Sequence, residues 1–316
     1  MIRVIILFSQ FENQSSIPKR LKEEITLFEN LESIESEIVY INSVDGCNKL
    51  ISNTTQSKTT ILFIATGGTE ELAKMIIDVN EHPILLIANS KQNSLAASLE
   101  IFSIYSGNKI IKHFYYETID ELCEEVNVFS HVTCAIKKVN NSRIGLIGEP
   151  SNWLLTSKNV ESFGPFRTEL INIDINEIND GVNTILNPEL ASQIETDYKH
   201  KCVCSTEINN SSKVYDALKT IVEKYNLNTL TVRCFDLLKY KYTACMALSK
   251  LNDENVVSGC EGDIFALFTM LVANKLVDEP VWMANPASIT STFIFSSAVA
   301  IRSFSVLVID APGLCS

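Results

Sequence analysis

The chain has 316 residues, a length that predicts two domains of about 150 residues each. Hydrophobic residues make up 46% of the chain and charged residues only 20%, a composition typical of a globular protein with well-buried cores. The net charge is −12 and no block of Lys and Arg rises above this acidic background, so we expect neither nucleic acid nor an anionic membrane as a partner.

Neither a targeting segment nor a membrane span is expected. The apolar start Met1–Phe8 is too short for a signal peptide. The two longest apolar stretches, Ile264–Val277 and Thr292–Ile309, are interrupted by polar or charged residues. The nine cysteines are unevenly spaced and most sit in apolar runs, as buried, reduced thiols do. We therefore expect a cytoplasmic protein.

In the first half of the chain, short apolar runs typical of buried strands alternate with the hydrophobic spacing typical of helices. Short apolar runs predict buried strands at Val4–Phe8, Glu37–Ile41, Ile61–Ala65 and Ile84–Ala88. Helical patterns predict helices at Pro18–Phe28, Thr69–Val79, Asn93–Tyr105 and about 118–138, with Thr69 as an N-cap. This rhythm predicts a parallel sheet covered on both faces, forming a first domain over residues 1–140 that ends at an Asn-Asn-Ser linker.

A second unit of the same kind is predicted for residues 141–288. Its expected strands are 144–147, 170–173 and 229–232, with a short apolar run at 256–257, and its expected helices are 213–225, 235–251 and 264–276. The architecture repeats without detectable repetition of sequence. The predicted fold is therefore α/β, with two tandem doubly wound (Rossmann-like) parallel-sheet domains.

Two polar clusters bracket the last predicted helix. Glu261 follows one apolar run, and Asn285 follows the run Val281–Ala284, which predicts another strand. Their separation of 285 − 261 = 24 residues fits one right-handed crossover between adjacent parallel strands, whose carboxyl edge is where ligands bind in such sheets. Carboxylate and amide oxygens suit a hard divalent cation. The sequence therefore predicts Glu261 and Asn285 as a shared site.

Three further residues have both a functional and a structural interpretation. Asp263 can bind substrate or serve as the N-cap of the following helix. Arg233 ends a strand at the same edge, where it can bind substrate oxygens or form an ion pair with Asp236 or Glu261. Trp153 can stack on a sugar or anchor an interface. All three are kept as candidate substrate-binding residues.

A glycine-rich turn also follows the third predicted strand. Thr66-Gly67-Gly68-Thr69 can cradle a phosphate at a helix N-terminus. It lacks the spacing of a dinucleotide fingerprint or a P-loop, so a tight strand-to-helix turn is the simpler interpretation.

Several motifs in order resemble the L-fucose isomerase-like family of sugar isomerases, which is distantly similar to L-arabinose isomerase. The resemblance covers roughly residues 1–288. It lies in these stretches: Thr66–Glu70, Asn93–Ala97, Gly148–Leu154, Thr231–Asp236, Ala244–Leu248, Glu261–Asp263 and Met283–Pro286.

The resemblance implies an aldose–ketose isomerase of carbohydrate metabolism that works through a metal-bound ene-diol. It implies Mn²⁺ or another divalent cation as the cofactor, a small-molecule sugar as the substrate and a homo-oligomeric assembly. Glu261 matches the family's first metal-binding carboxylate and would be both ligand and proton-transferring group. Asn285 stands where fucose isomerases have a second acidic ligand, and an amide can bind a metal but cannot transfer a proton.

The chain departs from this family after Asn285. Family members continue into a β-rich C-terminal domain that supplies a histidine ligand, whereas none of the four histidines here follows Asn285. Residues 289–316 are expected to be an apolar, β-prone remnant of that domain. The alternative function is therefore a catalytically inactive, truncated sugar-isomerase homologue that at most binds a polyol.

Overall fold

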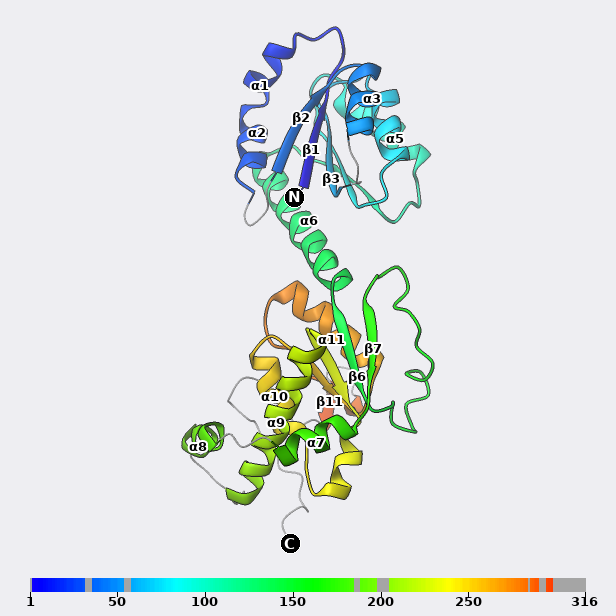
Figure 1. The fold of residues 1–316 in the computed structure, drawn as a ribbon. Coiled ribbons are helices and arrows are strands. Elements are labelled where there is room, and N and C mark those ends of the chain that lie inside the picture. The colour runs from blue at the N-terminus through cyan, green and yellow to red at the C-terminus, as the bar shows by residue number, and fades with distance from the viewer. Residues whose placement is uncertain are drawn as a thin grey trace. The chain divides into compact units, whose positions relative to one another are not determined.

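A computed structural model of the chain describes residues 2–31, 36–53, 58–184, 188–197, 205–283, 285–289 and 294–297. The chain divides into two compact units, unit 1 (residues 1–134) and unit 2 (residues 135–316). The division falls within the long helix α6 (Ile119–Asn140), whose last residue is the first of the predicted linker at 140–142. Figure 1 shows an α/β fold in each unit.

Unit 1 is built on a sheet of five parallel strands within its described part. Their order across the sheet is β2-β1-β3-β4-β5. Three of the strands are buried at every position, as expected for apolar runs in a parallel sheet that is covered on both faces. The strands are β1 (Ile2–Leu7), β2 (Ser36–Ile41), β3 (Thr60–Ile64), β4 (Ile84–Ala88) and β5 (Ile111–Tyr115).

Successive side chains of these strands enter two different cores. Val4 and Ile6 pack with α1, α2 and α6 on one face, whereas Ile5 and Leu7 pack with α3, α4 and α5 on the other. The unit is therefore doubly wound. The remaining helical elements of this unit are η1 (Gln14–Ser16), α1 (Ile17–Arg20), α2 (Lys22–Glu29), α3 (Val44–Asn53), α4 (Glu70–Asp78) and α5 (Ser94–Ile104).

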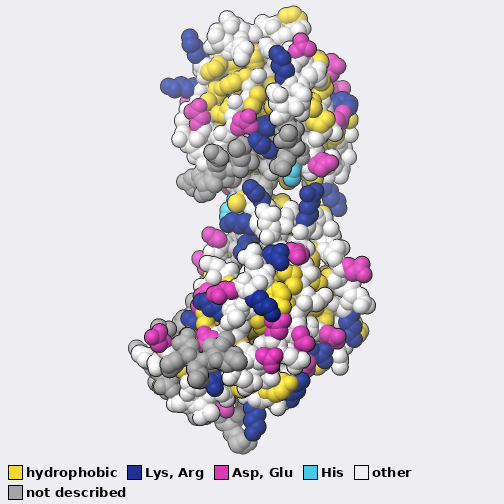
Figure 2. Space-filling model, in the orientation of Figure 1, with side chains coloured by type: hydrophobic (Ala, Val, Ile, Leu, Met, Phe, Trp, Pro, Cys, Tyr) yellow, Lys and Arg dark blue, Asp and Glu magenta, His cyan; other side chains and the backbone are white. Residues whose placement is uncertain are grey.

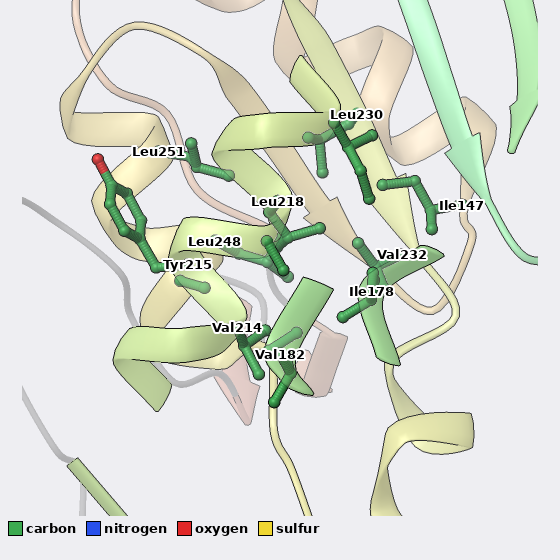
Figure 3. Close-up of a cluster of buried hydrophobic side chains, with 14 of the residues drawn as sticks. Ile147, Ile178, Val182, Val214, Tyr215, Leu218, Leu230, Val232, Leu248 and Leu251 are labelled. Atoms are coloured by element: carbon green, nitrogen blue, oxygen red, sulfur yellow. The ribbon is translucent and has the colours of Figure 1, made fainter. Parts of the chain in front are cut away.

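Unit 2 repeats this plan with four parallel strands in the order β7-β6-β8-β9. One face of the sheet packs on α7, α8, α9 and α10, and Figure 3 shows Ile147 and Val232 of the strands beside Leu218 and Leu248 of the helices. The opposite face packs on α11. The strands are β6 (Arg143–Ile147), β7 (Glu169–Ile173), β8 (Thr229–Val232) and β9 (Val257–Cys260). The helices are α7 (Asn176–Thr184), α8 (Pro188–Asp197), α9 (Ser205–Tyr225), η2 (Cys234–Tyr240), α10 (Cys245–Asp253) and α11 (Ile264–Val277).

The predicted α/β class and the two parallel sheets are confirmed. The sequence did not predict α3, β5, α7 or α8. The single helix expected over 235–251 is two helices, because the chain enters the left-handed region at Lys241 after a 3-10 helix. Thr69 occupies the N-cap position of α4, but its hydroxyl donates to the carbonyl of Thr66 and does not cap the helix.

The strand expected at Val281–Ala284 is absent from its described part, because residues 281–283 are irregular. Asn285 instead begins β10 (Asn285–Ile289), which pairs antiparallel with β11 (Ile294–Ser297) in a separate two-stranded sheet. Pro280 lies just before this segment and has no backbone N–H to extend the parallel ladder. Most of the tail 289–316 lies outside the described residues.

Within the described chain, no helix has both the length and the apolarity needed to cross a membrane. Acidic and basic side chains are interspersed over the visible face of each unit (Figure 2). The expectations that nucleic acid and membranes are not partners stay predictions.

We predict that Phe63→Ala lowers the free energy of unfolding by about 3–5 kcal/mol, because it empties a fully buried site. The Phe63 ring packs between Phe28 and Tyr116, with ring centroids 6.4 and 6.1 Å away. The matched control is Phe11→Ala in the same unit, where the ring is 90% exposed and removal should cost almost nothing. Urea titration followed by circular dichroism measures both, and equal effects would contradict the assignment of the core.

Candidate functional site

The carboxyl ends of β6, β8 and β9 meet at one edge of the unit 2 sheet. We call the residues that follow these ends, 148–153, 233–236 and 261–263, the rim. Parallel strands place their carboxyl ends together, so three stretches far apart in sequence become neighbours here. The predicted residues Trp153, Arg233, Glu261 and Asp263 all lie in the rim.

The chain reverses at Glu261 and Gly262 as it leaves β9 for α11. Both residues have a positive φ, 65° and 69°, which is rare for a glutamate. The Gly262 N–H donates to the Val232 carbonyl at 3.2 Å, and the Ser151 N–H donates to the Glu261 carbonyl at 2.9 Å. The reversal therefore fastens the end of β9 to the end of β8 and to the loop after β6.

Close packing fixes the backbone at Gly262. A Cβ atom there would lie 2.7 Å from the Glu149 carbonyl oxygen and 2.8 Å from the Pro150 Cα. Glycine is needed at this position both for its positive φ and for this approach.

Trp153 and Glu261 meet through their side chains. The indole N–H of Trp153 donates to Glu261 Oε2 at 2.8 Å. Trp153 is 58% exposed, and its ring meets that of Phe235 edge to face, with centroids 5.4 Å apart and planes at 82°. An oriented carboxylate thus lies beside two exposed aromatic rings.

Arg233 connects the loops after β6 and β8. Its guanidinium donates to the Pro150 carbonyl at 2.9 Å and to Asn152 Oδ1 at 3.3 Å, and its Nε lies 3.2 Å from Asp236 Oδ2. The predicted ion pair with Asp236 is confirmed. Its binding of substrate stays a prediction.

Asp263 is the N-cap of α11, as its structural interpretation predicted. Its Oδ1 accepts the Ala266 N–H at 3.0 Å and the Ser157 hydroxyl at 3.0 Å. Ser157 Oγ in turn accepts the Ile264 N–H at 3.2 Å. This carboxylate oxygen is already used by the protein, and a role of Asp263 in substrate binding stays a prediction.

Three sulfur-containing residues, Cys234, Cys260 and Met283, lie at or beside the rim, and the sequence analysis did not predict this. A hydrogen bond from the Cys260 thiol is the main cause that lowers the pKa of Cys234 to about 7, and the same pairing raises the pKa of Cys260. The Cys260 Sγ lies 3.8 Å from Met283 Sδ. The signal was the placement of Cys234 and Cys260 at the ends of two neighbouring strands.

The expected partnership of Glu261 with Asn285 is not tested, because the Asn285 side chain lies outside the described residues. Among the side chains that the structure describes, no three His, Cys, Asp or Glu residues are grouped so as to bind a metal ion. Of the predicted pair, Glu261 alone can be placed.

Unit 1 has a separate cavity of about 880 Å³ at the carboxyl edge of its sheet. The turn Thr66–Gly68 lines it, as do Gln92 and Asn93. Because Glu12, Glu70 and Glu100 also line the cavity, a phosphate there would meet like charges, which favours the tight-turn interpretation of this motif.

The chain is similar to two curated proteins, both called sulfoquinovose isomerase. One, from Alkalicoccus urumqiensis, is 23% identical over 193 residues, which cover 58% of this chain and 44% of the relative. The other, from Clostridium sp. (strain MSTE9), is 27% identical over 79 residues, which cover 24% of this chain and 18% of the relative. The chain thus spans less than half of the length of the relatives that it matches. No protein-family model matches it.

We predict that Gly262→Ala destabilises unit 2 more than Gly164→Ala does. Both glycines have a positive φ, 69° and 65°, so each substitution costs about 1–2 kcal/mol of left-handed strain. At Gly164 nothing lies within 4 Å of the new Cβ, whereas at Gly262 the overlap with backbone adds about 1–3 kcal/mol. Urea titration of both variants measures the difference. Equal losses of stability would show that the rim backbone shifts to accommodate the new Cβ atom, and would contradict the prediction.

We predict that Asp263→Ala lowers the free energy of unfolding by about 0.5–2 kcal/mol, because the Ala266 N–H loses its acceptor. Asp263→Asn retains a side-chain oxygen in the same place and should cost far less. Thermal unfolding of the two variants measures this contrast. An equal loss for both would mean that the charge, and not the cap, is what stabilises this end of α11.

Proposed function

We propose that this chain is an aldose–ketose isomerase that acts on a small sugar, with Glu261 as the group that transfers the proton. The observation that carries the proposal is the hydrogen bond from the Trp153 indole to Glu261 Oε2, which orients one carboxylate at the ligand-binding edge of the sheet. The similarity to two proteins named as sugar isomerases supports it.

Isomerisation of an aldose needs one proton moved between neighbouring carbons, and a carboxylate is suited to that transfer. Trp153 orients Glu261 Oε2, and in the described residues no hydrogen bond is made to Oε1. Oε1 would accept the proton from C2 of the open-chain sugar and return it to C1. Because the φ of 65° and the Ser151 hydrogen bond fix the Glu261 backbone, the carboxylate would keep its place between the two steps.

The exposed ring pair would supply the surface for the substrate. Trp153 and Phe235 are 58% and 50% exposed, and their edge-to-face contact holds both rings in place. The C–H faces of a sugar pack against such rings. A sugar seated there would lie beside the Glu261 carboxylate.

We further propose a divalent cation, Mn²⁺ by the family resemblance, with Glu261 and Asn285 as ligands. Glu261 fits this role as an oxygen donor at the sheet edge, while the described residues alone do not complete a coordination shell. A bound cation would polarise the sugar carbonyl. A homo-oligomer, also proposed by resemblance, would let a second copy contribute the missing ligands.

The charges of the rim favour a neutral sugar of the fucose or arabinose type. The rim contains the carboxylates of Glu149, Asp236, Glu261 and Asp263 against the single guanidinium of Arg233. Arg233 is already paired with Asp236. A sulfonated sugar such as sulfoquinovose, after which the relatives are named, would therefore meet net negative charge at the described rim.

We predict that Glu261→Gln lowers the rate of aldose–ketose conversion about 10²–10⁴-fold, because the amide cannot accept the proton. The assay incubates the full chain with Mn²⁺ and with L-fucose, L-arabinose or sulfoquinovose, and separates aldose from ketose by chromatography. The matched control is Glu223→Gln, the same change at an exposed carboxylate of α9 outside the rim, which should stay within about twofold of the unsubstituted chain.

Turnover that survives in Glu261→Gln would contradict the assigned role. No conversion of any of the three sugars by the folded, unsubstituted chain would favour the alternative, a homologue that binds a polyol without catalysis. Sulfoquinovose as the preferred substrate would contradict the charge argument alone.

A further inference from the structure

We propose that Cys234 and Cys260 form an oxidation site, at which a peroxide converts the two thiols into a disulfide between the ends of β8 and β9. The strands run side by side, with Val232 opposite Cys260 in their register, and Cys234 follows two residues after Val232. Both cysteines are free and half-buried, and both pack against the same hydrophobic core. The pair is therefore close in space although 26 residues (260 − 234) separate it in sequence.

The environment of the two sulfur atoms suits this reaction. Cys260 and Cys234 pack against the same core as Val232, and the Cys260 Sγ lies 3.8 Å from Met283 Sδ. The strand register brings Cys260 beside the end of β8, so its thiol is the expected partner for an oxidised Cys234.

The chemistry balances with hydrogen peroxide as the oxidant. The Cys234 sulfur attacks the peroxide, an S–O bond forms as the O–O bond breaks, and water leaves with a sulfenic acid as the product. The Cys260 sulfur then attacks Cys234, an S–S bond forms, and the hydroxyl leaves as a second water with the Cys260 proton. The sulfur pair loses two electrons and the peroxide gains them.

Trypsin separates the cysteines of this region, which makes the test direct. Cys234 falls in the peptide Cys234–Lys239, Cys245 in Tyr242–Lys250 and Cys260 in Leu251–Lys275. The full chain is treated briefly with equimolar hydrogen peroxide, blocked with N-ethylmaleimide in denaturant, and digested without reductant. Mass spectrometry should show Cys234–Lys239 linked to Leu251–Lys275, two hydrogens lighter than their sum. Cys234 should lose its free-thiol signal at least about tenfold faster than the buried Cys47.

Each control variant replaces one cysteine sulfur of the chain with oxygen. Cys260→Ser should abolish the linked peptide, whereas Cys245→Ser should retain it, with circular dichroism reporting that both are folded. Cys245 is an alternative partner, since the charge of Cys234 acts on it and its own charge acts on Cys260. A dominant link from Cys234 to Cys245, or unlinked Cys234 after Cys47 has reacted, would overturn the proposal.

A consequence for activity rests on the proposed function. Because Glu261 directly follows Cys260, a bond to Cys234 would shift the reversal at the rim and lower isomerase turnover, with recovery on addition of dithiothreitol. The disulfide is mapped without any substrate. Absence of isomerase activity would therefore not contradict the mapped disulfide. Absence of the disulfide would not contradict the proposed function.

Discussion

The candidate site depends on the reversal of the chain at Glu261 and Gly262. Two consecutive left-handed residues turn the backbone from β9 into α11, and two backbone hydrogen bonds join that turn to Val232 and Ser151. The loops after three strands thereby become one structure. The hydrogen bond between Trp153 and Glu261, which orients the carboxylate of the proposed site, requires this turn to be in place.

The polar residues of the rim differ in role. Some hold the backbone in place, and one is available for chemistry. Arg233 and Asp263 hold loops and a helix end together, through three and two side-chain contacts inside the protein. Glu261 is different, since within the described residues the hydrogen bond to its carboxylate comes from a neutral indole. A carboxylate that is oriented but not paired with a cation is what proton transfer to a sugar would need.

The sequence predicted much of the fold because continuous apolar runs mark buried parallel strands. β3 and β4 lie within one residue of their predicted ends and β1 within two, and their burial on both faces explains that clarity. β5 and α7 escaped notice because polar residues interrupt their patterns. The helix expected over 235–251 illustrates another limit, since a left-handed Lys241 cannot be recognised from its residue type.

The site was predicted in part for a related reason. Strand ends at one edge can be inferred from an alternating rhythm, and this placed Glu261 and Arg233 at the same edge. Contacts between side chains depend on turns, so the indole–carboxylate pair and the neighbouring thiols became visible only in three dimensions. For Asn285, the expected parallel strand gave way to an antiparallel hairpin.

The positive φ of Glu261 costs local stability at the position where the proposed chemistry needs a carboxylate. Of the eight non-glycine residues with positive φ in the described chain, five are asparagine or aspartate, whose short polar side chains tolerate this region best. A glutamate there gives up about 1 kcal/mol relative to a glycine. A search for sequences that merely stabilise this backbone would therefore discard the one carboxylate on which the proposed reaction depends, and selection for folding alone would remove the proposed activity.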